Sequence, residues 1–285
     1  FDNTLNAMRK AGFAEIHSYK EFKRKEDSPH IWGWGVEDGT FYKRFFEYLD
    51  ADHARHPGSP VFATLATVGT HIPCTGMPDY PDRMIRDPKN IRERYINALR
   101  LSDSHLRIFF NEIAKRGYLS NSVIILTSDH SFPMREHGIY NNEICRYEES
   151  FRIPFLMIWN GKISGNRIKG KAYSQLDIGP TVCDIIGIED TLNTMQGTSI
   201  LRETARHPIP LVQPYNGMFL EAVDWPYKYV KHLRTDEEFL YDLAADPEEK
   251  TDRAKTDPER VRNMRSLLDP VYITQKSVEE NKVRK

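Results

Sequence analysis

An aspartate and a histidine stand side by side at the end of an apolar run, in the segment Thr127-Ser-Asp-His130. A carboxylate oxygen next to an imidazole nitrogen suits Mn²⁺ or Zn²⁺ and, less well, Ca²⁺. The alternative is an aspartate at a turn followed by a surface histidine, which is common for so short a motif. Asp129 and His130 are therefore candidate metal ligands, and the alternative stays open on these residues alone.

The apolar run before this pair predicts the strand that would position it. Residues 123–126 are Val-Ile-Ile-Leu, with no polar alternation, as expected for a strand covered on both faces of a mostly parallel sheet. Ligands of open α/β sheets bind beyond the carboxyl ends of the strands. A second apolar run over 60–67 predicts another strand, and His71 follows it. A helix over 92–115 joins the two runs, so a right-handed strand, helix, strand unit would bring His71 and Asp129 to one sheet edge.

The composition is that of a globular chain without a strong charge bias. With 285 residues, of which 39% are hydrophobic, the chain can bury a core. Forty basic and 41 acidic residues leave a net charge of −1, so no global field attracts nucleic acid. No run approaches the roughly 20 apolar residues of a membrane span. The chain opens inside an expected helix without a signal peptide, so we expect a piece of a longer protein.

Four blocks of this sequence resemble the C-terminal half of a sulfatase-type domain of the alkaline phosphatase superfamily. They stand in the family's order: Thr127-Ser-Asp-His130 with Glu136-His-Gly138, Tyr147-Glu-Glu-Ser-Phe-Arg-Ile-Pro154, Leu176-Asp-Ile-Gly-Pro-Thr-Val-Cys-Asp-Ile-Ile-Gly187 and Leu240-Tyr-Asp-Leu-Ala-Ala-Asp-Pro-Glu248. Two upstream segments look more like the lipoteichoic acid synthase and phosphoglycerol transferase branch: Trp34-Gly-Val-Glu-Asp-Gly-Thr-Phe-Tyr42 and Leu65-Ala-Thr-Val-Gly-Thr-His-Ile-Pro73.

The resemblance implies an α/β fold with an alkaline-phosphatase-like, mostly parallel sheet flanked by helices and a small C-terminal antiparallel α+β subdomain. Residues 1–206 would form the main α/β region, with the N-terminal part of the domain missing. Residues 207–285 would form the C-terminal subdomain and a charged helical tail. We expect strands of that subdomain over 219–222, 227–231 and 238–241, and a loop over 200–215.

The resemblance also implies four substrate-binding residues. His71 matches a histidine that contacts the transferred group, and His137 matches one at the active site. Trp34 belongs to a segment that the family places beside the active site, although the same aromatic residue could pack beneath a loop. Arg135 is the fourth candidate, with simple exposure to solvent as the alternative.

The chemistry that the resemblance implies depends on a divalent cation, Mn²⁺ foremost and Ca²⁺ or Zn²⁺ as alternatives. Such a cation polarises a phosphoryl or sulfuryl oxygen and activates a hydroxyl nucleophile. Asp129 and His130 would supply two ligands, and in the family an upstream acidic residue and the nucleophile supply the rest. The upstream half of the domain is therefore an expected partner. Without it we expect weak metal binding and little or no catalysis.

Three functional hypotheses follow. The first is a phosphoglycerol transferase domain, extracytoplasmic (periplasmic or cell-surface), of a bacterial membrane protein anchored through a segment outside this chain, with a lipid-linked or glycan ester as substrate. The second is a sulfuric ester or phosphodiester hydrolase. Sulfatases usually carry a lysine after the glycine at 138, whereas the nearby residues here are Asn141, Asn142 and Arg146. The third is an inactive binding or scaffold relative, because Asp2 and Thr4 replace the Trp and Arg of the synthase branch.

Overall fold

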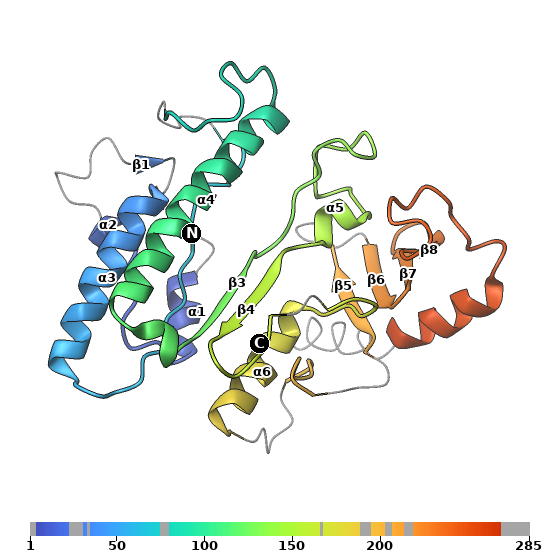
Figure 1. The fold of residues 1–285 in the computed structure, drawn as a ribbon. Helices are drawn as coiled ribbons and strands as arrows, with labels where there is room; N and C mark the ends of the chain where they lie inside the picture. Colours follow the sequence, from blue (N-terminus) through green and yellow to red (C-terminus); the bar gives the residue numbers. More distant parts are fainter. Residues whose placement is uncertain are drawn as a thin grey trace. The chain divides into compact units, whose positions relative to one another are not determined.

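The computed structural model describes residues 4–22, 31–32, 35–74, 80–165, 168–188, 195–202, 207–213 and 219–268. They form two compact units (Figure 1). One comprises residues 1–124 and 158–163, and the other comprises residues 125–157 and 164–285. Among the described residues, no helix has the length and apolar character that crossing a membrane requires. The predicted division near residue 206 stays a prediction.

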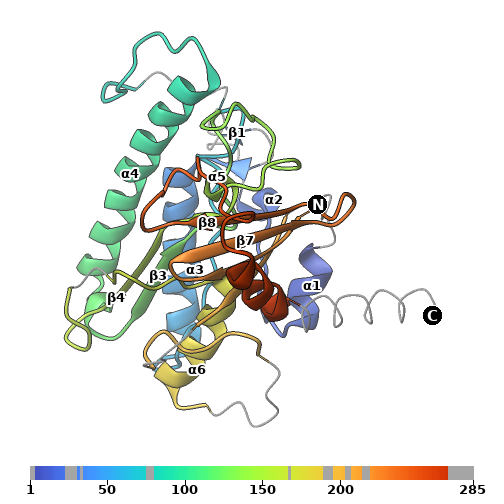
Figure 2. The ribbon, with the colours of Figure 1, turned by 90° about the vertical axis from the view of Figure 1, so that its right-hand side faces the viewer.

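The first unit is built on two long helices, α3 (Asp38–Arg55) and α4 (Ile91–Lys115). They pack through aromatic rings: the ring centroid of Phe109 lies 5.1 Å from that of Tyr42 and 5.5 Å from that of Phe46. Figure 2 shows α4 running beside α3. Before them come the helices α1 (Thr4–Lys10) and α2 (Tyr19–Phe22) and the paired strands β1 (Ile31–Trp32) and β2 (Gly35–Val36). The helix α4 confirms the helix predicted over 92–115.

The strand predicted over 60–67 is wrong. These residues have no assigned secondary structure, and Phe62 is 69% exposed. An apolar run forms a strand only where a neighbouring strand supplies backbone hydrogen-bond partners, and no described segment pairs with this one. The run is a loop that leads to the turn of His71, so the predicted strand, helix, strand unit lacks its first strand.

Two strands follow α4, and the first confirms the strand predicted over 123–126. They are β3 (Val123–Thr127) and β4 (Phe155–Trp159), which hydrogen-bond to each other in a two-stranded sheet. The short helix α5 (Glu148–Phe151) precedes β4. The 3-10 turn η3 (Gln175–Asp177) leads directly into α6 (Ile178–Ile186).

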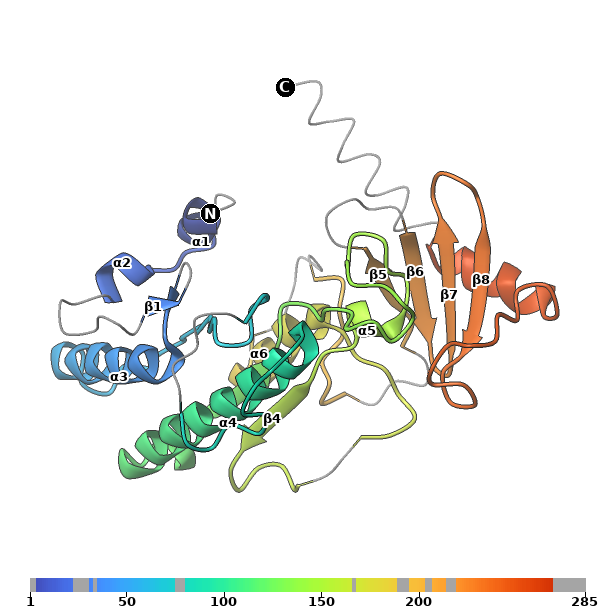
Figure 3. The same cartoon turned by 90° about the horizontal axis from the view of Figure 1, so that it is seen from above.

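The second unit contains a four-stranded antiparallel sheet (Figure 3). Its strands are β5 (Ile209–Val212), β6 (Phe219–Asp224), β7 (Tyr227–His232) and β8 (Glu238–Asp242), paired in that order. Three of them confirm the prediction, whereas β5 lies where a loop was predicted. Pro210 explains the error, because proline argues against a central strand but is tolerated in an edge strand such as β5.

Alternate residues of this sheet face two different cores. One face packs against the helical residues 258–268, through Leu220, Ala222, Tyr229, Leu240, Val261, Met264 and Leu268. The other face contains Ile209, Phe219, Val223, Val230, Tyr241 and Leu243. A lysine and a glutamate, Lys228 and Glu221, share this second face and are fully buried.

Lys228 is the centre of a buried charge cluster. Its Nζ lies 3.2 Å from a carboxylate oxygen of Glu148, 3.2 Å from one of Glu221 and 3.0 Å from one of Glu249, and it donates to the carbonyl of Arg146 at 3.0 Å. Burial opposes the charge of the lysine, but the carboxylates raise its pKa. Burial raises the pKa of Glu221 to about 8 despite the attraction of Lys228. We expect Glu221 to hold a proton at neutral pH.

Candidate active site

A hydrogen-bonded turn follows the last residue of β3. Ser128 Oγ donates to the carbonyl of His130 at 2.8 Å, and the backbone N–H of His130 donates to Asp129 Oδ1 at 2.9 Å. Thr127 Oγ1 donates at 3.1 Å to the carbonyl of Pro154, the residue before β4. The turn is therefore connected to the neighbouring strand.

The two predicted metal ligands lie next to each other on this turn. His130 Nδ1 lies 2.8 Å from the carbonyl oxygen of Ser131, which can only accept, so Nδ1 donates a hydrogen in this contact. His130 Nε2 lies 3.8 Å from Asp129 Oδ2, and the Asp129 side chain is 85% exposed. An imidazole nitrogen and a carboxylate oxygen in this arrangement fit two ligands of a divalent cation. Within the described part of the chain, no three His, Cys, Asp or Glu side chains gather into a metal site.

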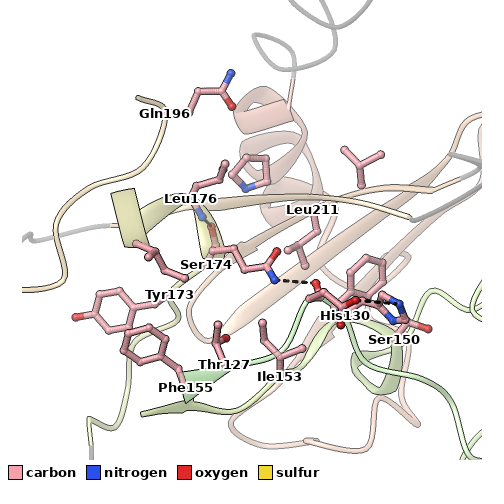
Figure 4. Close-up of a pocket in the computed structure, with 16 residues that line it drawn as sticks. Thr127, His130, Ser150, Ile153, Phe155, Tyr173, Ser174, Leu176, Gln196 and Leu211 are labelled. Atoms are coloured by element: carbon pink, nitrogen blue, oxygen red, sulfur yellow. Dashed lines mark hydrogen bonds and ion pairs between the residues drawn. The ribbon is translucent and has the colours of Figure 1, made fainter. Parts of the chain in front are cut away.

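A cavity of about 440 Å³ opens beside this pair, within the second unit (Figure 4). Polar side chains of Tyr173, Ser174, Gln175 and Gln196 line it together with Asp129 and His130. Apolar residues, among them Phe155 and Leu211, form most of the remaining wall. Apolar walls with a few polar groups are typical of a small-molecule site.

One residue that sequence reasoning missed contacts the turn directly. Gln175 Nε2 donates to the carbonyl of Ser128 at 2.6 Å and to the carbonyl of Asp129 at 2.7 Å. Gln175 stands just before the sulfatase-like block that begins at Leu176, and nothing in its local sequence indicated a contact 46 and 47 residues away. Only the fold reveals it.

The buried carboxylate of Asp177, the last residue of η3, has partners in several segments. No side-chain hydrogen bond caps α6. Instead the Asp177 carboxylate forms a capping box with Ser174 around η3. It also accepts from the backbone N–H of Thr198 at 2.8 Å and lies 2.9 Å from His207 Nε2. A buried carboxylate with three partners connects three segments and fixes η3.

His71 belongs to the first unit and lies in a turn. Its backbone N–H donates to the carbonyl of Val68 at 3.0 Å. The buried carboxylate of Asp38 accepts from the backbone N–H groups of Val68 at 3.0 Å and Gly69 at 3.1 Å. A side chain at Gly69 would collide with this carboxylate. Asp38 therefore holds the turn that presents His71, and the predicted convergence of His71 with Asp129 stays a prediction.

Glu37, the residue before Asp38, forms a buried pair with His105. Glu37 accepts from the first backbone N–H groups of α3, and its carboxylate lies 2.6 Å from His105 Nε2 on α4. Burial alone would raise the pKa of Glu37, but the hydrogen bond and charge of His105 and the backbone donors together lower it to about 2. The pair therefore joins the start of α3 to the middle of α4.

His137, a predicted substrate contact, already has protein partners on both ring nitrogens. Its ring stacks on Tyr147 with centroids 3.6 Å apart. Nδ1 lies 2.7 Å from a carboxylate oxygen of Glu149, and Nε2 lies 2.8 Å from the carbonyl of Glu248. A bond from His137 to substrate would have to replace one of these partners, and this role stays a prediction.

Arg135 and Trp34 are the two remaining candidates for substrate binding. Arg135 is exposed, has a left-handed φ of +77° and places its guanidinium carbon 5.0 Å from the centroid of the Tyr140 ring. Its role in substrate binding stays a prediction. Trp34 lies outside the described residues.

Comparison with known proteins relates this chain to sulfatases and lipoteichoic acid synthases. Residues 2–188 match the sulfatase family. Lipoteichoic acid synthase of Staphylococcus saprophyticus is 27% identical over 242 residues, which are 81% of this chain and 34% of that protein. N-acetylgalactosamine-6-O-sulfatase of Bacteroides thetaiotaomicron is 27% identical over 251 residues, 76% of this chain and 48% of that protein. The chain thus spans between a third and a half of the length of these relatives.

A solved structure of a lipoteichoic acid synthase has a similar fold. The crystal structure of the lipoteichoic acid synthase LtaP from Listeria monocytogenes aligns with a TM-score of 0.72 at 20% identity, covering 95% of this chain and 67% of that one. This likeness confirms the predicted alkaline-phosphatase-like α/β fold class. Because the family match covers well over half of the residues, the chain belongs to the sulfatase family.

Proposed function

We propose that this chain is part of the extracytoplasmic catalytic domain of a membrane-anchored phosphoglycerol transferase that requires a divalent cation. The main support is the turn after β3, where Asp129 and His130 present an oxygen and a nitrogen ligand beside a cavity. A cation bound there, Mn²⁺ foremost, would polarise an oxygen of the transferred phosphoryl group. Further ligands would come from other residues of the full-length protein.

The residues of this chain would orient the cation and the substrate. The hydrogen bond of His130 Nδ1 to the Ser131 carbonyl directs Nε2 away from the backbone, which suits a ligand nitrogen. The hydroxyl groups of Tyr173 and Ser174, which line the cavity, can hydrogen-bond a glycerol moiety. His71 would hydrogen-bond the phosphoryl group or protonate the leaving alcohol, as its position in the family suggests.

The substrate would be a lipid-linked or glycan phosphate ester. Similarity to lipoteichoic acid synthase over 81% of this chain favours the transfer of phosphoglycerol to an alcohol. A second candidate is hydrolysis of a sulfuric ester or a phosphodiester, favoured by the equal identity to the Bacteroides sulfatase. The two reactions share the cation and differ in the acceptor, which is an alcohol in the first and water in the second.

The test measures product release by the full-length protein with Mn²⁺ on three substrates: phosphatidylglycerol, a chromogenic phosphodiester and a chromogenic sulfate ester. We expect diacylglycerol release from phosphatidylglycerol, lost after chelation of the metal and in Asp129→Asn. Release of sulfate alone would establish the second candidate instead. Mn²⁺ binding without turnover of any of the three would indicate an inactive binding relative.

A further inference from the structure

We propose that Gln175 positions the two candidate metal ligands by holding the backbone of the turn after β3. The inference rests on the proposed function, because the orientation of Asp129 and His130 matters only if they bind a cation. Gln175 itself would touch neither the cation nor the substrate. It is a positioning residue that acts through two carbonyl groups.

The chemistry of the amide group suits this role. Gln175 Nε2 has two hydrogens and lies within hydrogen-bond distance of two consecutive carbonyls, 2.6 Å from that of Ser128 and 2.7 Å from that of Asp129. A single neutral group thus satisfies both acceptors. A carboxylate of the same length has no hydrogen to donate and would place its oxygens against these carbonyls. Figure 4 shows the side chains around this turn.

The backbone that carries Gln175 is itself fixed. Gln175 is the first residue of η3, which the capping box of Ser174 and Asp177 closes. Asp177 is in turn held by the backbone of Thr198 and by His207. The side chain of Gln175 therefore extends from a segment that is held in place. Because that segment is fixed, the two hydrogen bonds of the side chain restrain the backbone of the turn.

The turn needs such a restraint because its functional side chains have little packing around them. The Asp129 side chain is 85% exposed, and its carboxylate accepts hydrogen bonds from Ser128 and His130 of the same turn. Its direction is therefore set by the backbone to which it is attached. Outer partners of this kind change metal affinity by about 10- to 100-fold when they are removed.

The experiment compares Mn²⁺ affinity in the full-length protein, measured by electron paramagnetic resonance of free Mn²⁺, with the urea unfolding midpoint of the metal-free protein. The test variants are Gln175→Met, which keeps the length without the donors, and Gln175→Glu. Gln196→Met is the matched control, because Gln196 lines the same cavity but has no hydrogen bond to the turn in the described structure. We expect affinity about 10- to 100-fold weaker in both Gln175 variants and within about twofold of wild type in the control.

The outcomes separate this inference from the proposed function. Loss of Mn²⁺ affinity in the Gln175 variants with an unchanged metal-free midpoint supports the positioning role. If Asp129→Asn weakens Mn²⁺ binding and both Gln175 variants retain wild-type affinity, the inference is overturned and the proposed function stands. If Asp129→Asn also binds Mn²⁺ as tightly as wild type, both are overturned. A lowered midpoint with unchanged affinity would mean that Gln175 is only structural.

Discussion

Replacing Glu221 by glutamine should change how the stability of this protein depends on pH. Glu221 is fully buried, and its pKa is raised from an ordinary 4.5 to about 8. Between these values the folded state holds a proton that the unfolded state has released, so wild-type stability falls as pH rises. The slope is about 1.4 kcal/mol per pH unit, which amounts to roughly 3 kcal/mol from about pH 5.5 to about pH 7.5. Glutamine resembles the protonated carboxyl and removes this dependence.

Urea unfolding of wild type and Glu221→Gln at the two pH values checks the prediction. Every other titrating group is common to both proteins, so only the difference between them is interpreted. The free energy of unfolding of Glu221→Gln minus that of wild type should increase by roughly 3 kcal/mol from the lower pH to the higher. The control is Glu259→Gln, at an exposed helical position, which should follow wild type within about 0.5 kcal/mol. Parallel pH dependence of wild type and Glu221→Gln would refute a buried protonated carboxyl.

Three further predictions concern buried groups. Lys228→Met leaves three carboxylates without their cation and should lower the free energy of unfolding in urea by about 3–5 kcal/mol, whereas Lys231→Met on the same strand should change it little. Asp38→Ala removes the acceptor of two backbone N–H groups and should cost about 1–3 kcal/mol for each one left unsatisfied, seen as a lower thermal midpoint. The pKa of Glu37 is lowered to about 2, so its contribution is complete above about pH 4.5 and is lost as pH falls towards 2. Glu37→Gln should therefore unfold at a lower temperature than wild type at pH 6, and the gap should narrow below about pH 4.5 and close only near pH 2. A gap independent of pH would contradict the ion pair with His105.

The spacing of apolar residues along the chain correctly predicted the helix α4 and the strand β3. The apolar period of residues 92–115 matches α4 almost residue for residue, and the run over 123–126 matches β3. The same reasoning failed for residues 60–67, because an apolar run does not specify whether a partner strand lies beside it. It also failed for β5, where a proline that would exclude a central strand is accepted at a sheet edge.

The candidate site was predictable only in part, for a related reason. Residue chemistry at a strand end pointed to Asp129 and His130, and the structure places them side by side. Their support was not predictable, since the partner of the turn, Gln175, is 46 residues further along the chain than Asp129. The burial of Lys228 escaped as well: in an alternating strand a lysine indicates a solvent-facing position. Its ammonium group is buried because it forms ion pairs with Glu148, Glu221 and Glu249.

The match to the sulfatase family covers residues 2–188, but the segment that follows the candidate ligands is held by hydrogen bonds to residues beyond that point. The backbone N–H of Glu148 donates to Glu249 at 2.6 Å, and Gln213 donates to the carbonyl of Asn142 at 3.0 Å. A shortened protein that ends at residue 188 would lack Gln213 and Glu249 and would leave the N–H of Glu148 and the carbonyl of Asn142 without these partners. Recombinant versions intended for binding work should therefore include the antiparallel sheet and the residues up to Glu249, because residues 2–188 lack hydrogen-bond partners of this segment.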